Sequence, residues 1–513
     1  MSSKNASSKR QFSSCAVRAV VSAFFAGMLF GSSAYADEQK PAVAAPDVMH
    51  TLASRVERFQ LENGLRVILF RRENAPVFAG QTWVKVGGVD EVPGKTGAAH
   101  LLEHMAFKGT DKIGTKDYAK EKPLLDELET LMHQKIKAGT PEAERAMAIY
   151  KELAGLWVDN DFSRIYQRRG GVGLNAGTAK DYTMYQIELP SVAFELWCWM
   201  ESERVLHPVF RQFYKEREVV REERRMRTDD DPGGKLYEAM LATAYWNHPY
   251  RLPTIGWSSD IRSLTADDTM ALQQRYYRPD NMVVVLVGDL DPQVVKPMIQ
   301  KYFGRLPKAD SILPVVTAEE EPQEAPREVA VPFDAEPSLI MAYHKPVYPD
   351  ADDIYFSILH SLLSGGKSSV LHRELVVEKQ LATGVGTSEA PGELFPSLFY
   401  VSATPRHGVT TRALMEEIQK TLDRIGRDGF SDEDFNAAKK RVKVGFLGGL
   451  DSNDELAETL GHAELLWNDW AAVLKMYEIV DGATKQNVQS LITKYLRPQN
   501  RTFAHLEKKE GGK

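Results

Sequence analysis

An internal repeat is the feature that most constrains the fold of this chain. Residues 265–281 match residues 484–500 at a constant offset of 219, from a threonine at the start to an Arg-Pro pair and an asparagine at the end. In both copies the threonine can cap a helix, and the Arg-Pro pair marks a turn before a segment typical of a strand. A chain that repeats one helix–turn–strand unit in this way is predicted to contain two copies of one α+β domain.

A second correspondence indicates that the two copies differ in length. Gly109 ends a predicted helix in the first copy and matches Gly366 in the second, with an offset of 257. The later offset of 219 is 38 residues smaller, so the first copy holds extra residues between these landmarks. Residues 116–168 are rich in lysine, glutamate, leucine and alanine, and Thr140 followed by Pro141 is typical of a helix start. We therefore predict a charged helical hairpin inserted at residues 116–168 of the first domain only.

Strand signals and a proline-rich segment set the predicted domain boundaries. Two apolar segments around Asn63-Gly64 predict a β-hairpin, and a later helix is expected from about Ala98. Residues 309–331 hold three prolines and three consecutive glutamates, which is typical of a linker. The predicted architecture is a first α+β domain at residues 54–308, the linker at residues 309–331 and a second, homologous α+β domain at residues 332–513.

The first 36 residues are typical of a signal peptide. Four positive charges within residues 4–18 precede an apolar segment at residues 19–30, and Ala34-Tyr35-Ala36 is a small-x-small cleavage site. We predict cleavage after Ala36, a flexible leader at residues 37–53 and a periplasmic location for the mature protein. The alternative is an uncleaved N-terminal anchor.

Composition disfavours several classes of function. The formal net charge is -7, so nothing favours nucleic acid as a partner. Beyond the N-terminal segment no stretch is long and apolar enough to span a bilayer, so we expect no membrane span in the mature chain. The two cysteines exclude a disulfide framework, and Cys198 lies in an apolar segment where a buried, inert thiol is expected.

The motif His100-Leu101-Leu102-Glu103-His104 carries the predicted chemistry. Residues four apart lie on one face of a helix, so the two imidazoles can bind the same zinc ion. Glu103 shares the face of His100 and can act as the general base toward a water that zinc activates. This is the H-x-x-E-H order of the inverted zincins. We predict one Zn²⁺ per chain, with the alternative that backbone or solvent satisfies the two histidines.

A catalytic zinc site also needs a third protein ligand. A helix from Phe213 to Met226 would gather two carboxylates on an otherwise apolar stripe, which consists of Glu216, Val219, Val220, Glu223 and Met226. Carboxylates in such a place need partners. Metal ligation by Glu223, with Glu216 behind one of the ligands, would explain both. Glu222, on the other side of the helix, is the second candidate, and a solvated face of Glu–Arg pairs is the alternative.

These residues resemble the pitrilysin/insulinase family of metallopeptidases, which includes the mitochondrial processing peptidase. The matching segments span almost the whole mature chain: His100 to Thr110, Leu174 to Ala176, Glu216 to Glu223, His248 to Tyr250 with Gly256, Tyr277 to Asn281, Gly288-Asp289 and Gly365 to Ser369. The resemblance implies a half-length bacterial member with two homologous domains that face each other across a chamber.

The resemblance also implies roles for particular residues. His100, His104 and Glu223 would bind zinc, with Glu103 as the base and Glu216 behind a ligand. A strand near Asn175 and Ala176 would bind the backbone of a substrate peptide as an added strand. The alternative for Asn175 is a turn residue before Gly177.

Two departures from the family pattern affect this site. The 123 residues from His100 to Glu223 form a wider gap than the family usually has, and the insert at residues 116–168 accounts for the excess. Active members also bind substrate through an arginine and a tyrosine in a C-terminal domain, and here Val376 and Thr383 occupy those positions. The resemblance therefore implies a second homologous chain that supplies the Arg/Tyr pair, or a homodimer.

The combined interpretation is a zinc-dependent metalloendopeptidase that hydrolyses peptides or unfolded polypeptide segments in the periplasm. Two alternatives would use the same fold: a catalytically silent scaffold or partner subunit, and a peptide-binding chaperone. The intact His100, Glu103 and His104 favour the peptidase, because a silent subunit need not keep all three.

Overall fold

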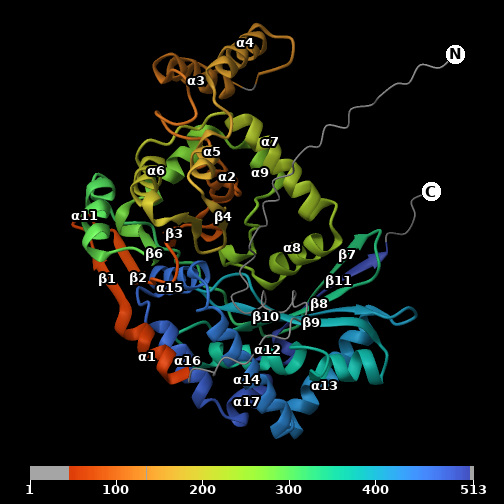
Figure 1. Ribbon diagram of the computed structural model, residues 1–513. Coiled ribbons are helices and arrows are strands. Elements are labelled where there is room, and N and C mark those ends of the chain that lie inside the picture. The colour runs from red at the N-terminus through yellow and green to blue at the C-terminus, as the bar shows by residue number, and fades with distance from the viewer. Residues whose placement is uncertain (1–44, 135, 509–513) are drawn as a thin grey trace, which may run out of the picture.

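Two mixed β-sheets form the core of the chain (Figure 1), of which the computed structural model describes residues 45–134 and 136–508. The first sheet has the order β1-β2-β6-β3-β5-β4 and the second the order β7-β11-β8-β10-β9. Their strands are β1 (Val56–Gln60), β2 (Arg66–Arg71), β3 (Val77–Val84), β4 (Val172–Thr178), β5 (Thr183–Pro190) and β6 (Met282–Gly288), then β7 (Arg327–Phe333), β8 (Leu339–Lys345), β9 (Ala382–Ala390), β10 (Ser397–Pro405) and β11 (Arg501–Lys508).

The pairing of the strands confirms the predicted duplication. Each sheet, among the described strands, contains one parallel pair, β2 with β6 in the first and β7 with β11 in the second. When these pairs are aligned, β2-β6-β3-β5-β4 matches β7-β11-β8-β10-β9 strand for strand, and β1 is an additional edge strand. The fold class is therefore α+β with two similar domains, as the repeat indicates.

The helices follow the same order in both halves. Helix α2 (Ala98–Met105) follows β3 in one half, and α12 (Ala351–Ser364) follows the matching strand β8 in the other. The later helices are α6 (Phe194–Leu206), α7 (Phe213–Arg224), α8 (Pro232–Ala244), α9 (Ser258–Ser263) and α10 (Ala266–Tyr276), matched by α13 (Thr411–Asp428), α14 (Asp432–Gly448), α15 (Asn453–Trp467), α16 (Ala472–Gly482) and α17 (Lys485–Tyr495). The repeated segments are α10 and α17, which both begin with a capping box at the predicted threonine.

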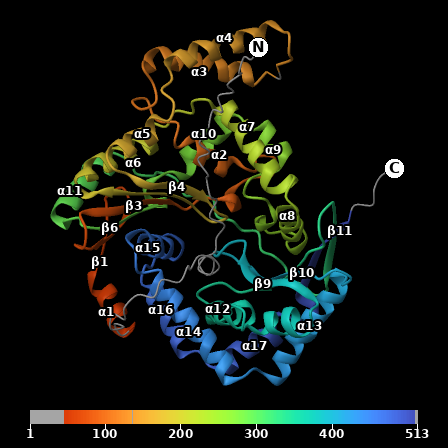
Figure 2. The same ribbon diagram turned by 45° about the vertical axis from the view of Figure 1, so that its right-hand side comes forward.

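One helix from each half packs on the sheet of the other half. Helix α15 packs on β3 and β6 of the first sheet, where Leu456 and Leu460 share one buried cluster with Trp83. Helix α8 packs on β7, β8 and β11 of the second sheet, where Leu241 shares a cluster with Ile340. Figure 2 shows α15, in blue, beside the strands of the first sheet. These exchanged helices α8 and α15 hold the two domains face to face and give them a shared core.

The segment at residues 116–168 contains α3 (Tyr118–Met132), α4 (Pro141–Leu156) and α5 (Asp161–Arg168). The Thr140 hydroxyl accepts a hydrogen bond from the Ala143 N–H and Pro141 opens α4, which confirms the predicted helix start. Helices α3 and α4 pack around a small core of their own, and they project from the body of the molecule in Figures 1 and 2.

The base of this hairpin is joined to the domain by a buried ion pair. Arg211 contacts the Glu121 carboxylate at 2.7 Å, and both side chains are almost completely buried. The same guanidinium donates to three backbone carbonyl oxygens of the loop after α2, among them Thr110 and Ile113. The tip of the hairpin is therefore separate from the domain core, but its base is part of that core.

Two predicted connecting segments are partly structured, and the sequence interpretation was wrong for those parts. Helix α1 (Ala45–Arg55) occupies the end of the expected leader, and Leu52 is buried against the first sheet. Strand β7 begins at Arg327, inside the expected linker, and pairs with β11. Both segments gain order from contacts with residues far away in the chain, which local composition does not reveal. The predicted signal peptide and residues 37–44 lie outside the described residues.

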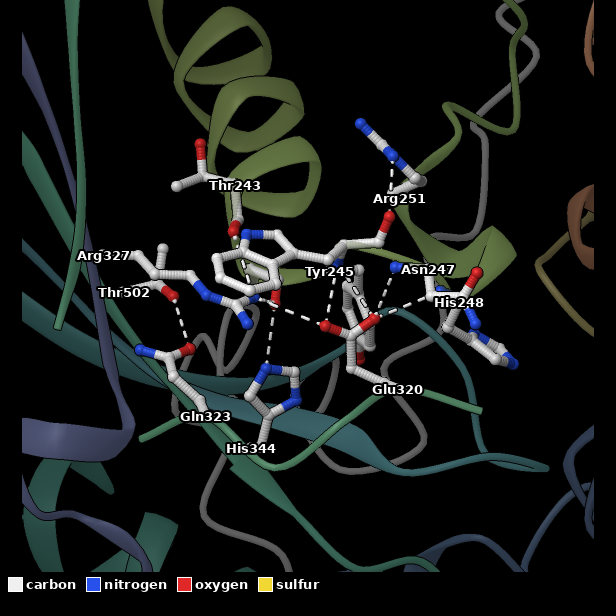
Figure 3. Close-up of polar contacts among 12 residues, drawn as sticks. Thr243, Tyr245, Asn247, His248, Arg251, Glu320, Gln323, Arg327, His344 and Thr502 are labelled. Atoms are coloured by element: carbon white, nitrogen blue, oxygen red, sulfur yellow. Dashed lines mark hydrogen bonds and ion pairs between the residues drawn. The ribbon is translucent and has the colours of Figure 1, made fainter. Parts of the chain in front are cut away.

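The irregular part of the linker is tied to the C-terminal end of α8 (Figure 3). The Glu320 carboxylate accepts hydrogen bonds of 2.8–3.1 Å from the backbone N–H groups of Trp246, Asn247 and His248. Arg327 donates to the last carbonyl oxygens of α8, and its guanidinium lies 4.0 Å from the centre of the Trp246 ring. The linker therefore fastens α8 to the second sheet.

Two smaller predictions are also tested by the described residues. Cys198 is buried in α6, and burial raises the pKa of its thiol, which agrees with an inert side chain. None of the described helices is both long and apolar enough to cross a membrane.

Candidate metal centre

Helix α2 holds the histidine motif between the first sheet and α7. Leu101, Leu102 and Met105 are buried in the core of the first half, so the other face of the helix, with both histidines, is turned toward α7. The helix starts without a side-chain cap of its own, because Gly97 precedes it with φ 88°. Glu91 supplies the missing acceptor: its carboxylate receives hydrogen bonds from the N–H groups of Gly97 and Ala99 at 2.9 and 2.7 Å.

His100, His104 and Glu223 form a compact cluster of potential metal ligands. Their ligand atoms all lie within 4.8 Å of one another, with Glu223 Oε2 at 3.8 Å from His100 Nε2 and 3.6 Å from His104 Nε2. These separations are too long for hydrogen bonds. Two ligands of one tetrahedral zinc ion, each about 2.0–2.2 Å from the metal, lie about 3.4 Å apart. Since His104 Nε2 is also buried without a hydrogen-bond partner among the described residues, the donor set fits zinc.

Glu216 lies behind His104, where the sequence analysis expected it. Its Oε1 atom is 3.0 Å from His104 Nδ1, and its Oε2 atom is 2.5 Å from Lys108 Nζ. A proton on Nδ1 leaves the Nε2 lone pair directed at the cluster. Burial alone would raise the pKa of Glu216, but the hydrogen bonds and charges of His104 and Lys108 lower it to about 2. The carboxylate is therefore ionised and holds the imidazole in one orientation.

Glu103, the predicted base, is buried beside this cluster. Its Oε2 atom accepts a hydrogen bond of 2.8 Å from the Thr178 hydroxyl on β4. Burial raises the pKa of Glu103, while the nearby His104 charge and the Thr178 hydrogen bond act against that rise. Burial also lowers the pKa of His100 well below its usual value, which favours the neutral imidazole that a metal requires.

Helix α7 places the two candidate third ligands differently. Glu223 lies in the cluster, whereas Glu222 is 53% exposed and pairs with Arg225 at 2.5 Å. The expected stripe is only partly buried, because Val219 and Met226 are exposed. Met226 falls in a π-helical turn that follows α7, which changes the direction of its side chain. The exposed Val219 leaves apolar surface on α7, and the exposed Met226 leaves it on the turn that follows.

Asn175 and Ala176 lie on β4, the outermost strand of the first sheet. They pair with Gln186 and Tyr185 of β5, so the other edge of β4 has no strand partner among the described residues. Asn175 is therefore part of a strand and not of a turn before Gly177. Ala176 is buried and Asn175 is partly exposed. Helix α2 packs against β4, which brings this edge strand next to the histidine motif.

Val376 and Thr383 lie in the second half. Val376 belongs to a π-helical segment, His372–Glu378, and packs against the core of that half. Thr383 is the second residue of β9 and donates a hydrogen bond of 3.3 Å to the Thr404 carbonyl oxygen. Neither side chain offers a positive charge or a phenol.

Sequence analysis did not assign two residues that contact the candidate site, Thr178 and Lys108. Thr178 follows Asn175 by three residues on the same strand, and Lys108 lies in the segment after His104 that carries part of the family resemblance. Both belonged to segments already singled out, but their contacts with Glu103 and Glu216 depend on how α2, β4 and α7 pack together.

Comparisons with known proteins assign the family. A family model described as "Insulinase (Peptidase family M16)" matches residues 66–124, and one described as "Peptidase M16 inactive domain" matches residues 263–442. "Zinc protease PqqE" of Helicobacter pylori is 30% identical over 407 residues, which cover 78% of this chain and 81% of that protein. The crystal structure of a protease from Helicobacter pylori, 27% identical, covers 88% of this chain and 99% of that chain with a TM-score of 0.75.

A third comparison concerns length. The periplasmic protease PqqL of Escherichia coli is 18% identical with a TM-score of 0.66, and the similarity covers 88% of this chain but 47% of that one. At this identity the similarity shows the fold alone. Together with the other matches, it identifies this chain as a half-length member of the M16, or pitrilysin/insulinase, family of metallopeptidases.

Proposed function

We propose that this protein is a zinc-dependent endopeptidase that cleaves peptides or unfolded polypeptide segments. The observation that carries the proposal is the buried cluster of His100, His104 and Glu223 with Glu103 beside it. Two imidazoles and one carboxylate are a ligand set that leaves a fourth position of a tetrahedral zinc ion open for chemistry. The names of relatives such as zinc protease PqqE agree with this proposal.

Each residue of the site has a separate task in this proposal. Bound zinc would lower the pKa of a water molecule and polarise the carbonyl group of a peptide bond. The Glu103 carboxylate takes up a proton at its free oxygen, while Thr178 holds the other oxygen in place. Glu216 fixes the ring of His104, and Lys108 keeps Glu216 charged.

The free edge of β4 supports an extended peptide as the substrate. A peptide that adds to this edge as a further strand would satisfy its backbone hydrogen bonds at Asn175 and its neighbours. Most of the backbone of a folded protein is already hydrogen-bonded and cannot pair in this way without opening first. We therefore propose peptides and unfolded segments as the substrate class.

The proposal includes a second chain. Hydrolysis passes through an oxyanion that needs hydrogen-bond donors besides the metal. Val376 and Thr383 cannot supply a guanidinium and a phenol, so we propose that a homologous chain provides an arginine and a tyrosine. A homodimer is the second candidate, and it would have to draw such donors from other positions.

We further propose that the protein acts in the periplasm after export. The support is the signal-peptide pattern of residues 1–36 and the similarity to PqqL, which is described as a periplasmic protease. Detection of the mature N-terminus at Asp37 in a periplasmic fraction would support this location, and a cytoplasmic chain that keeps residue 1 would contradict it.

The decisive experiment combines zinc analysis with a peptide-cleavage assay. We expect about one zinc per chain, loss of zinc in Glu223→Gln, and normal zinc in the matched control Glu222→Gln. Cleavage that a chelator abolishes, and that appears when the homologous partner is added, supports the full proposal. Zinc without cleavage in any pairing would favour a silent scaffold, and peptide binding without zinc would favour a chaperone.

A further inference from the structure

A second group of potential ligands lies where the helical hairpin meets the domain. Glu129 lies in the last turn of α3, and His133 directly follows that helix. Asp267 lies in the first turn of α10. His133 Nε2 is 2.9 Å from Asp267 Oδ2 and 3.4 Å from Glu129 Oε1, and the ligand atoms of all three residues lie within 4.8 Å of one another. No part of the proposed peptidase site uses these residues.

The cluster is held in position by its surroundings. Glu129 and His133 are four residues apart, so their side chains leave the helix on one face. The Tyr214 hydroxyl of α7 donates to Glu129 Oε2 at 2.5 Å, and the backbone N–H of Asp267 donates to Glu129 Oε1 at 3.2 Å. Glu129 is only 16% exposed. These contacts orient one carboxylate before any ion binds, which is how supporting hydrogen bonds act in metal sites.

The cluster brings two carboxylates to one imidazole. No lysine or arginine among the described residues forms an ion pair with Glu129 or Asp267. A divalent cation would neutralise both carboxylates, and it would leave the imidazole neutral as a ligand.

We propose that Glu129, His133 and Asp267 form a second binding site for Zn²⁺, which fastens the hairpin to the domain. One imidazole nitrogen and two carboxylate oxygens suit zinc, whereas Mg²⁺ and Ca²⁺ prefer sets made only of oxygen. His133 is 47% exposed and Asp267 is 70% exposed, so water completes the coordination. This exposure makes the second site weaker than the buried cluster of His100, His104 and Glu223.

The position of this site gives it a mechanical effect. The hairpin has its own small core, and the buried Glu121–Arg211 pair holds the start of α3. Glu129 and His133 lie at the other end of α3, next to α10, so a metal ion there would hold the helix at both ends. Zinc concentration would thereby set how firmly the hairpin is held against the body of the protein.

A zinc titration of the full-length protein, loaded at its first site, tests the proposal. The wild type is expected to bind a second equivalent, and His133→Ala and Asp267→Asn are expected to lose it while they keep the first. The control His407→Ala changes an exposed histidine of the second half and should keep both equivalents. Tyr214→Phe removes the hydrogen bond to Glu129 and should weaken the second equivalent by about ten-fold.

Hydrogen exchange of the α3 backbone gives an independent measurement. Added Zn²⁺ should slow exchange in the C-terminal part of α3 in the wild type and in His407→Ala, but not in His133→Ala. The proposal is overturned if the wild type binds a single equivalent, if His133→Ala keeps the second, or if Mg²⁺ protects α3 as well as Zn²⁺ does. None of these readouts depends on peptide cleavage, so they separate this site from the proposed peptidase function.

Discussion

The histidine-bearing helix of the first half and its counterpart in the second half are packed alike but carry different side chains at the matching positions. Helix α2 packs against α7, and α12 packs against α14 in the same relation. At the offset of 257, Ser357, His360 and Ser361 of α12 stand where His100, Glu103 and His104 stand in α2. The scaffold is repeated, but within the described residues groups of three potential metal ligands occur in the first half only.

The facing helices differ in the same sense. Helix α7 brings the carboxylates of Glu216 and Glu223 to the histidines, whereas α14 brings a positive charge. Arg441 of α14 donates to the Ser361 hydroxyl and to the Ser361 carbonyl oxygen, both at 3.0 Å. These residues line a cavity of about 730 Å³ in the second half. In the first half two carboxylates of α7 therefore face the histidines of α2, whereas in the second half a guanidinium of α14 contacts α12.

The sharpest test of this comparison changes one residue in each helix. Glu103→Gln should reduce peptide cleavage by about 10²–10⁴-fold, because only the general base is lost, and zinc content should stay unchanged. His360→Gln, at the matching position of α12, should alter cleavage less than two-fold. Initial rates and zinc content measured side by side decide the matter. An equal loss of cleavage in both variants would mean that the second half takes part in the chemistry.

The exchanged helices provide a test of how far the two halves are independent. Leu460 of α15 is buried on the first sheet and Leu241 of α8 on the second. Replacement of either leucine by alanine should destabilise the protein by about 2–5 kcal/mol. Both halves should still unfold together in one urea transition, followed by fluorescence and circular dichroism. Two separate transitions would show that each half is stable without the helix of the other.

Buried histidines of the two halves should respond to pH with opposite signs. Burial lowers the pKa of His248 to about 4, so below about pH 6.5 the unfolded chain binds a proton that the folded chain refuses. Stability should therefore fall by about 3 kcal/mol between pH 6.5 and 4. Asparagine can accept the hydrogen bond that His248 Nδ1 receives from the Tyr250 N–H. The variant His248→Asn should therefore lose less stability between pH 6.5 and 4 than the wild type.

His462 in the second half is the matched case. Burial lowers the pKa of His462, but the charge and hydrogen bond of Glu393 outweigh burial and raise it. This residue therefore stabilises the fold at low pH, and the contribution is lost as pH rises through its folded pKa. Urea unfolding from pH 4 to 8 measures both effects. If His248→Asn loses as much stability at acid pH as the wild type, other groups cause the acid sensitivity.

The smallest expected effect concerns the residue behind His104. Glu216→Gln should weaken zinc binding by about 10–100-fold, because the ring of His104 loses its charged acceptor. Arg441→Gln removes the contact that stands in the corresponding place of the second half, and it should leave zinc affinity unchanged. Competition with a coloured chelator gives both affinities. Equal zinc affinity in Glu216→Gln and the wild type would remove Glu216 from the site.

Much of the fold could be predicted from sequence because the duplication leaves local traces. Residues close together in the sequence determine several elements. They are the capped helix and Arg-Pro turn of α10 and α17, the hairpin of β1 and β2, and the start of α4. The histidine spacing on α2 is equally local, since one helical turn sets it.

Other features could not be predicted because long-range contacts determine them. The sequence near residue 52 does not indicate that α1 packs on the first sheet. The sequence near residue 327 does not indicate that β7 pairs with β11 in the second sheet. The exchange of α8 and α15, and the contacts of Thr178 with Glu103, exist only after distant segments meet. Glu223 could be favoured over Glu222 from helical geometry alone, but Val219 and Met226 on the same stripe are exposed.

The exchange of α15 also has a consequence for the order in which the chain folds. The Gln81 side chain of β3 donates to Asp454 across a separation of 373 residues, and Trp83 is covered by the same helix. Contacts between such distant residues form slowly, since a long loop must close before they contribute. During synthesis the first sheet has one apolar face uncovered until residues 453–467 have followed, and partly folded chains in that state are prone to aggregate. The first sheet is therefore completed only when α15 of the second half has been synthesised and has packed on it.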